Sequence, residues 1–133
     1  MKFLLDTNIC IAIIKRKPPQ VLARLFASPP EDVTISAITV AELRFGADKS
    51  QLSERNHKAI DNFCVPIGII DFDYACAAVY GAIRANLATK GTPIGPLDML
   101  IAAQAVGNGL ILVTNNEREF RRIKNLKIEN WLS

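Results

Sequence analysis

Apolar residues occur along the chain in two patterns, one typical of strands and one typical of helices. Short uninterrupted apolar runs rich in β-branched residues indicate strands buried in a sheet. These runs predict strands at residues 3–5, 33–35, 65–70, 110–113 and 127–129. Elsewhere apolar residues recur every three or four positions, which is the spacing of one buried helix face. This spacing predicts helices at residues 9–14, 21–26, 39–49, 52–64, 73–90 and 97–106, and a short one that ends near 122.

Strands and helices alternate over the full length, and this alternation predicts an α/β fold. A parallel sheet with helices on both of its faces is the arrangement that such a chain adopts. With 133 residues and no repeat or linker, the sequence suits a single domain at 1–133. No apolar stretch approaches the roughly 20 residues that cross a bilayer. The N-terminus lacks the features of a signal peptide, so we expect no membrane association.

The composition is that of an ordinary globular protein, with 50% hydrophobic and 22% charged residues. Cys10, Cys64 and Cys76 are odd in number and contain no Cys-x-x-Cys pair, which argues against a disulfide framework and a zinc knuckle. Buried, reduced cysteines predict a cytoplasmic protein. The net charge of +3 is compatible with a polyanionic partner but does not identify one.

Three carboxylates occupy comparable places in the predicted elements. Asp6 follows the first strand, Glu42 lies one turn into the third helix, and Asp98 stands near the start of the helix at 97–106. Ligands bind at the carboxyl edge of open α/β sheets, so an acid there is a candidate metal ligand. Each acid also has a structural explanation, because Asp6 and Asp98 suit helix N-caps and Thr39 with Glu42 fits a capping box. Only the three acids together indicate a metal-binding site.

Asp98 favours the chemical interpretation, because Leu97 and Met99 surround it with apolar side chains. A carboxylate in such surroundings is costly to ionise unless a cation or strong donors stabilise it. If the strand ends bring the three acids together, their repulsion raises at least one pKa and a divalent cation relieves it. Oxygen ligands without histidine or thiolate favour Mg²⁺ or Mn²⁺ over zinc. Such an ion activates water and offsets charge on a phosphodiester.

Other catalytic schemes have less support in the sequence. His57 is the only histidine and lies among polar residues of a predicted surface helix, so we expect a solvated side chain. There is no Gly-x-Ser-x-Gly elbow, and a nucleophilic triad is therefore not indicated.

Basic residues fall into two groups, which indicate either solvated helix faces or a groove that follows a nucleic-acid backbone. The first group is Lys15, Arg16, Lys17 and Arg24, and the second is Arg118, Arg121, Arg122, Lys124 and Lys127. Aromatic residues interleave little with either group, so the sequence gives base stacking little support.

Four motifs, in this order along the chain, resemble those of PIN-domain ribonucleases of the VapC toxin type. They are LLDTN at 4–8, SAITVAEL at 36–43, GPLDMLIA at 95–102 and LVTNNEREF at 112–120. The resemblance implies a PIN domain with a five-stranded, mostly parallel sheet and Mg²⁺- or Mn²⁺-dependent endoribonuclease activity. Carried over motif by motif, Asp6, Glu42 and Asp98 are the metal-binding acids.

The resemblance also implies partners and a substrate. VapC toxins belong to type II toxin–antitoxin systems, form homodimers and are neutralised by a cognate VapB-type antitoxin in a higher assembly. The antitoxin's C-terminal segment lies near the acids and often inserts a basic side chain, which can take the place of the cation. An exposed apolar helix surface in the first half of the chain is the expected docking face. The subgroup with Asp-Thr-Asn-Ile-Cys and Gly-Pro-x-Asp is thought to cut initiator tRNA in its anticodon region.

One position departs from the family pattern. Many PIN domains carry a fourth acid where this chain has Asn116, which we include among the catalytic residues as a group that binds or orients water. Glu119, one turn later, is the candidate for the missing charge. The expected supporting residues at the strand ends are Thr7, Asn8, Ser36, Thr114 and Glu119.

An alternative from another class is a non-catalytic metal-binding or receiver-like signalling module, which also collects acids at strand ends. Receivers have an acidic pair after the first strand, whereas Thr7 follows Asp6 here. They also carry a phosphorylatable Asp after the third strand, where Asp71 is better explained as a residue that starts a helix. The two classes differ in whether the protein takes a phosphoryl group from acetyl phosphate or cuts structured RNA.

Overall fold

The computed structural model describes residues 1–133 and contains one five-stranded sheet. Every strand pair is parallel, and the strand order is β3-β2-β1-β4-β5. The strands are β1 (Phe3–Leu5), β2 (Val33–Ser36), β3 (Gly68–Ile70), β4 (Ile111–Val113) and β5 (Ile128–Glu129). The α/β class and the parallel sheet predicted from the sequence are confirmed. All carboxyl ends of the strands therefore lie along one edge of the sheet.

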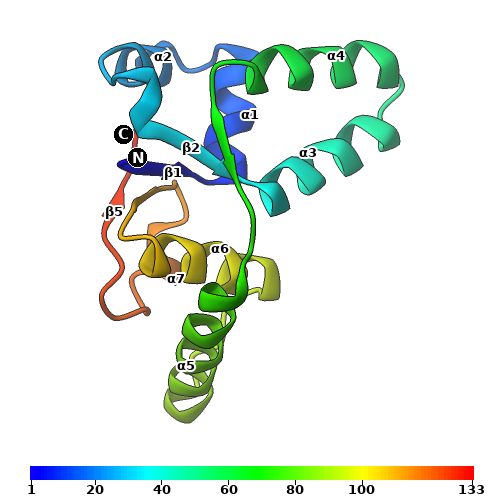
Figure 1. The fold of residues 1–133 in the computed structure, drawn as a ribbon. Helices are drawn as coiled ribbons and strands as arrows, with labels where there is room; N and C mark the ends of the chain where they lie inside the picture. The colour runs from blue at the N-terminus through cyan, green and yellow to red at the C-terminus, as the bar shows by residue number, and fades with distance from the viewer.

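Helices connect the strands and cover both faces of the sheet (Figure 1). They are α1 (Thr7–Lys15), α2 (Pro19–Phe26), α3 (Ala37–Lys49), α4 (Ser53–Cys64), α5 (Tyr74–Lys90), α6 (Pro96–Gly107) and α7 (Glu117–Phe120), with a short 3₁₀ turn at Pro30–Asp32. Figure 1 shows α1 to α4 on one side of the sheet and α5 to α7 on the other. No helix is long and apolar enough to span a membrane.

Alternate residues of the central strand β1 point to opposite faces and join two separate cores. Phe3 and Leu5 belong to a core with residues of α1 to α4, while Leu4 belongs to a second core with residues of α5 to α7. The edge of Trp131 packs on the Phe3 ring, with centroids 5.3 Å apart. Because β1 is buried on both faces, its C-terminal residue is held rigidly where the helices begin.

Some predicted element boundaries were wrong, each for a local reason. The third strand was expected from residue 65, but Val65 closes α4 with a hydrogen bond from its N–H to the Asp61 carbonyl, and it is 83% exposed. Pro66 has no N–H to donate to a strand ladder, so pairing starts only at Gly68. Asp73 rather than Asp71 caps α5, accepting a hydrogen bond from the Cys76 N–H.

The three cysteines are free, as the sequence predicts. Cys10 and Cys76 are buried, and Cys64 is partly exposed. Burial raises the pKa of the Cys10 thiol well above its usual value. These residues therefore pack as small apolar side chains rather than as nucleophiles.

Candidate active site

Asp6 lies directly after β1 and begins the candidate site. It is only 5% exposed and caps α1, accepting a hydrogen bond from the Thr7 N–H at 2.9 Å. Its second carboxylate oxygen accepts a hydrogen bond of 2.8 Å from the hydroxyl of Thr114, which follows β4. Burial raises the pKa of Asp6, and the bonds from Thr114 and Thr7 partly offset that rise. The N-cap interpretation is therefore correct, and one oxygen remains directed toward the neighbouring strand end.

Glu42 reaches the same edge from α3, the helix that follows β2. The Thr7 hydroxyl donates a hydrogen bond of 3.0 Å to its Oε1. The expected capping box with Thr39 was wrong, because α3 begins earlier and Ser36 caps it through a hydrogen bond from the Ile38 N–H to its Oγ. The Thr39 hydroxyl is instead buried without a partner. Glu42 is thus free of capping and turned toward the end of β1.

Asp98 occupies the first turn of α6 and does not cap that helix, whose N-cap is Gly95. Its pKa is raised to about 6, first by burial and then by the negative charges of Asp6, Glu119 and Glu42. The side chain has no hydrogen-bond donor in the structure, and no Lys or Arg forms an ion pair with any of the four acids. The apolar setting expected from the sequence therefore does raise the pKa of this acid.

Asn116 and Glu119 extend the acidic cluster beyond β4. The Asn116 N–H donates to the Thr114 hydroxyl at 3.0 Å, and its side-chain amide donates to Glu119 Oε2 at 3.1 Å. Glu119 is therefore held beside the position where many PIN domains have an acid. Asn8 is exposed and makes only a long contact of 3.4 Å with Asn115.

Hydroxyl and amide groups, not cations, hold these acids in place. Thr7 joins Asp6 to Glu42, while Thr114 joins Asp6 to Asn116 and so to Glu119. In this conformation no three acidic side chains come close enough to share one ion. Asp6, Glu42 and Glu119 each accept a hydrogen bond from a local donor, whereas Asp98 accepts none. The four acids nevertheless lie close enough for their charges to act on one proton equilibrium, that of Asp98.

The donor set suits a hard divalent cation. All the candidate ligands are carboxylate or neutral oxygen atoms, and neither histidine nor thiolate is among them, which is the chemistry that Mg²⁺ and Mn²⁺ prefer. Burial is the main cause of the raised pKa of Asp98, and the nearby charges of Asp6, Glu119 and Glu42 add to it. A cation placed among these oxygens would reverse that shift.

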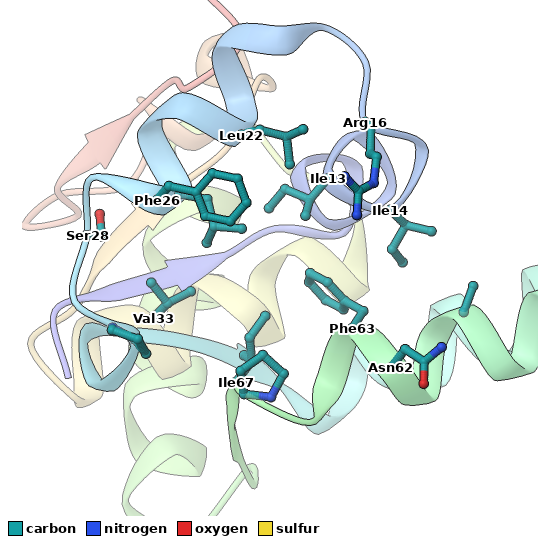
Figure 2. A pocket seen from close by; sticks show the side chains of 14 residues that line it. Ile13, Ile14, Arg16, Leu22, Phe26, Ser28, Val33, Asn62, Phe63 and Ile67 are labelled. Carbon is teal, nitrogen blue, oxygen red and sulfur yellow. The ribbon is translucent and has the colours of Figure 1, made fainter.

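An apolar groove lies between α1, α2 and α4, on the face of the sheet opposite α6 (Figure 2). Its main apolar lining residues are Ile13, Ile14, Leu22, Phe26, Phe63 and Ile67. Phe26 is 76% exposed, so the groove opens to solvent. Arg16, from the first basic group, lies at its rim.

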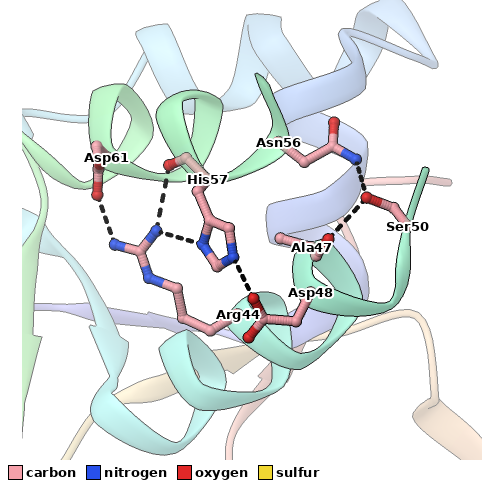
Figure 3. A network of polar contacts seen from close by, with 7 residues as sticks. All are labelled: Arg44, Ala47, Asp48, Ser50, Asn56, His57 and Asp61. Carbon is pink, nitrogen blue, oxygen red and sulfur yellow. Dashed lines mark hydrogen bonds and ion pairs between the residues drawn. The ribbon is translucent and has the colours of Figure 1, made fainter. Parts of the chain in front are cut away.

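His57 belongs to a polar network between α3 and α4, so the expectation of a solvated histidine was wrong (Figure 3). Arg44 approaches His57 Nδ1 at 3.1 Å, donates to the His57 carbonyl at 3.2 Å and pairs with Asp61. Because arginine only donates, Nδ1 accepts, and Nε2 donates to Asp48 at 2.8 Å. The network fastens α4 to α3 and lies apart from the four acids.

Some of the basic residues form ion pairs or hydrogen bonds within the fold. Arg24 pairs with Glu129 at 2.7 Å, Arg121 pairs with Glu117 at 2.8 Å, and Arg122 donates to the Pro93 carbonyl at 3.1 Å. Arg118 is exposed next to Glu119 and makes no such pair. The second basic group therefore contributes fewer free charges than the sequence suggests.

Comparisons with known proteins identify the family to which this arrangement belongs. The chain matches the PIN-domain family over residues 3–126. It is 49% identical, over 131 residues, to a protein of Shigella flexneri named tRNA(fMet)-specific endonuclease VapC, and the match covers 98% of each chain. The chain belongs to the VapC ribonucleases of the PIN-domain family. The PIN-domain and VapC resemblance that the four motifs suggest is therefore confirmed.

Solved VapC structures share the fold over nearly the whole PIN domain. A DNA-bound VapBC complex from Salmonella typhimurium has a chain that is 46% identical, with a TM-score of 0.94 and 98% of both chains covered. A VapBC2 complex from Rickettsia felis, bound to a promoter DNA fragment, is 41% identical, with a TM-score of 0.93 over 98% of this chain and 99% of that one. The sheet order 3-2-1-4-5 also differs from the 2-1-3-4-5 order of receivers, which argues against the receiver-like alternative.

Proposed function

We propose that the protein is the toxin of a type II toxin–antitoxin pair and acts as a divalent-metal-dependent endoribonuclease. One observation carries the proposal: four acids gather at the strand edge without a cationic partner. The pKa of Asp98 is raised to about 6, first by burial and then by the charges of the other three acids. Strongly perturbed acids at such an edge are typical of functional sites. Family membership makes nuclease chemistry the natural use of that cluster.

Asp6, Glu42 and Asp98 would hold Mg²⁺ or Mn²⁺, which when bound supplies an activated water and offsets charge on the phosphodiester. Thr114 and Thr7 orient the carboxylates of Asp6 and Glu42 through hydrogen bonds of 2.8 and 3.0 Å. These bonds fix the carboxylate orientations before substrate arrives, which reduces the reorganisation required during catalysis.

Asn116 and Glu119 complete the site on the side of β4. The Asn116 amide donates to Glu119 Oε2, leaving the amide oxygen free to accept a hydrogen bond from water. Glu119 supplies the negative charge that an aspartate at position 116 provides in many PIN domains. Burial and the neighbouring negative charges raise the pKa of Asp98 to about 6, and a cation held among the acids would lower it.

The substrate we propose is initiator tRNA, cut in its anticodon region and left with 5′-phosphate and 3′-hydroxyl ends. The Shigella flexneri relative that is 49% identical carries tRNA(fMet) specificity in its name. The exposed Arg118 beside Glu119 is available to contact the RNA backbone, which a guanidinium recognises by charge and hydrogen bonding. A cytoplasmic location follows from this substrate.

The partner we propose is a VapB-type antitoxin whose apolar segment fills the groove between α1, α2 and α4. VapBC complexes are the solved structures that this chain resembles. Phe26 and Phe63 line the groove and are exposed or partly exposed, so an amphipathic segment can cover them (Figure 2). Since Asp6 caps the same α1 helix, a basic side chain beyond the segment would reach the acids and take the place of the cation. A homodimer of toxins within this assembly is part of the proposal.

Replacing Asp6 with asparagine tests the nuclease proposal. Asparagine keeps the cap on α1 through its amide oxygen, so we expect the fold to remain. Because loss of a group that only orients a metal ligand costs 10–100-fold, loss of a ligand should lower RNA cleavage by at least about 100-fold and abolish growth arrest in cells. Cleavage of tRNA with Mg²⁺ and the binding of Mn²⁺ by calorimetry are the two measurements.

Glu54→Gln is the matched control, because Glu54 is an exposed acid of α4 that forms no ion pair. It should cleave RNA and bind Mn²⁺ as the parent does. Full activity of Asp6→Asn would remove Asp6 from the mechanism and with it the proposed metal site.

A further inference from the structure

Phe45 is a large aromatic side chain that the core does not use. Its residue is 67% exposed, and it lies on α3 three residues after Glu42. Single exposed apolar residues are common on protein surfaces and need no special explanation. The position of this one, next to the candidate site and under a cation, distinguishes it from the others.

Phe45 shares a face of α3 with Glu42, one turn further along the helix. Residues three apart on a helix have Cβ atoms about 5–6 Å from one another. Helical side chains lean toward the N-terminus of their helix, and the N-terminus of α3 is at the carboxyl edge of the sheet. Phe45 therefore leans toward Glu42 and the acids.

The ring is open to a ligand. Its neighbours Ala41 and Gly46 are exposed and small, and a Cβ added at Gly46 would meet no atom within 4 Å. The Lys49 ammonium lies 5.8 Å from the ring centroid, on the next turn. Lys49 forms no ion pair with any carboxylate of the chain. An unobstructed aromatic ring and an unpaired cation thus stand together beside an anionic cluster.

We propose that Phe45 and Lys49 bind an unpaired base of the RNA substrate and its phosphate, next to the bond that is cut. This rests on the proposed nuclease function and names a subsite for it. Bases stack on aromatic rings largely irrespective of sequence, and a lysine neutralises the adjoining phosphate. Such a subsite selects unpaired, splayed loop nucleotides over duplex RNA, because paired bases are already stacked on one another.

Lys49 has a second function in this arrangement, because the acids repel the RNA backbone. The four carboxylates of the site have no cation of the fold beside them. Lys49 lies one turn beyond Phe45, on the side away from Glu42. Its positive charge attracts the phosphate there, so that the base stacks on the Phe45 ring and the phosphate stays away from the acids. The subsite therefore orients the strand before the scissile phosphate approaches the acids.

The test removes the aromatic ring at position 45 while keeping an apolar side chain, and it removes the charge at position 49. An RNA stem–loop with a fluorescent adenine analogue in its loop is titrated into the Asp6→Asn protein carrying Phe45→Leu, Phe45→Tyr or Lys49→Gln. We expect Phe45→Leu to weaken binding by about 10-fold and to remove the quenching that stacking causes. Phe45→Tyr keeps the ring and should bind as the parent does. Lys49→Gln should lower the slope of log K against log salt by about 1.

Controls separate the possible failures. A fully paired RNA duplex should bind Phe45→Leu and the parent equally, and the melting temperature should not change because Phe45 is exposed. If Phe45→Leu binds and quenches the stem–loop as the parent does, the stacking subsite is wrong while the nuclease proposal stands. If the otherwise unaltered protein does not cut the stem–loop with Mg²⁺, the nuclease proposal itself fails. A Phe45→Leu effect confined to self-association, measured by sedimentation, would assign the ring to a protein interface and overturn the subsite.

Discussion

Glu42 and Arg44 are two residues apart on α3, yet they belong to opposite kinds of charge cluster. Arg44 lies between Asp61 and His57, and His57 in turn meets Asp48, so each acid of that network has a nitrogen donor (Figure 3). Glu42 and the other three acids of the site have hydroxyl or amide partners or, for Asp98, none at all. Helix α3 thus takes part in one cluster whose acids bind nitrogen donors and in one whose acids have no cation beside them.

The two clusters differ in whether their acids are paired within the fold, and this difference separates structural acids from candidate ligand-binding acids. Charges that are paired within the fold hold elements together, as Arg44 holds α4 against α3. Acids that remain uncompensated at a strand edge cost stability, and a fold retains them because a ligand from outside completes them. In the site, burial and the charges of the neighbouring acids together raise the pKa of Asp98.

Thr114→Val would break the anionic cluster and should have the largest effect on cleavage. The buried Thr114 hydroxyl donates to Asp6 and accepts from the Asn116 N–H, and valine does neither. Loss of groups that orient a metal ligand typically costs 10–100-fold, so we expect kcat to fall by about 10- to 100-fold. The pKa of Asp6 should rise, which moves the acid limb of the pH–rate profile to higher pH.

Thr34→Val is the matched control. Thr34 is a buried threonine of β2 whose hydroxyl donates to the Phe3 carbonyl at 2.7 Å. Both variants should lose about 1 kcal/mol of folding free energy, but only Thr114→Val should slow cleavage. Equal cleavage by the two would mean that Thr114 serves the fold alone.

Arg44→Ala would disrupt the polar network between α3 and α4. It removes the ion pair with Asp61 and the hydrogen bond to the His57 carbonyl, and it leaves that carbonyl less well satisfied. Since the pair is partly exposed, we expect the free energy of unfolding to fall by about 1–2 kcal/mol, measured by urea denaturation. RNA cleavage per folded molecule should change little.

Arg55→Ala provides the comparison on α4, because Arg55 is exposed and unpaired. Its effect on unfolding should stay within about 0.5 kcal/mol. A tenfold loss of cleavage in Arg44→Ala without loss of stability would show that the two clusters are not separate.

Asp98→Asn replaces one acid that has no partner and so removes the free-energy cost of ionising it in the folded protein. The folded-state pKa of Asp98 is about 6 against an ordinary 3.8, so the folded protein binds this proton more tightly and loses stability as pH rises between those values. Asparagine avoids that loss. Solvent screens a partly exposed group and so reduces the effect. We therefore expect the free energy of unfolding of Asp98→Asn to be only about 1 kcal/mol higher than that of the parent at pH 7 with a chelator.

The gain should fade as pH falls from about 6 to about 4, where Asp98 itself becomes neutral. Urea denaturation at a series of pH values measures it, with the exposed Asp71→Asn as the control. A gain that is the same at pH 4 and pH 7 would show that packing, not charge, is responsible.

The fold was largely predictable because its signals are local. The apolar run before Asp6 and the helical rhythm of residues 73–90 each mark an element without reference to the rest of the chain. The missed boundary at Val65 depends on a helix C-cap beside a proline, and an apolar run alone does not contain that information. The true cap of α3, Ser36, was hidden because it also ends β2.

The site was predictable as a set of residues but not as a set of contacts. The predicted elements placed Asp6 after a strand and Asp98 near the start of a helix, which made both candidates. The bonds from Thr7 to Glu42 and from Thr114 to Asp6, in contrast, link segments 35 and 108 residues apart. His57 was misjudged for the same reason, since Arg44 reaches it across two helices. Phe45 and Lys49 are four residues apart on a predicted helix, so their proximity could have been predicted. The exposure of the Phe45 ring could not.

Asp6 caps the N-terminus of α1, and residues near the other end of this helix line the apolar groove. An inhibitor that contacts both the acids and the groove must therefore span the length of α1. Its nine residues span about 13 Å at 1.5 Å per residue. An extended peptide covers that distance in about four residues. If an antitoxin segment occupies the groove as proposed, a tail only slightly longer than that segment reaches the acids. We then expect that trimming a few residues from the tail restores cleavage while the two proteins stay bound.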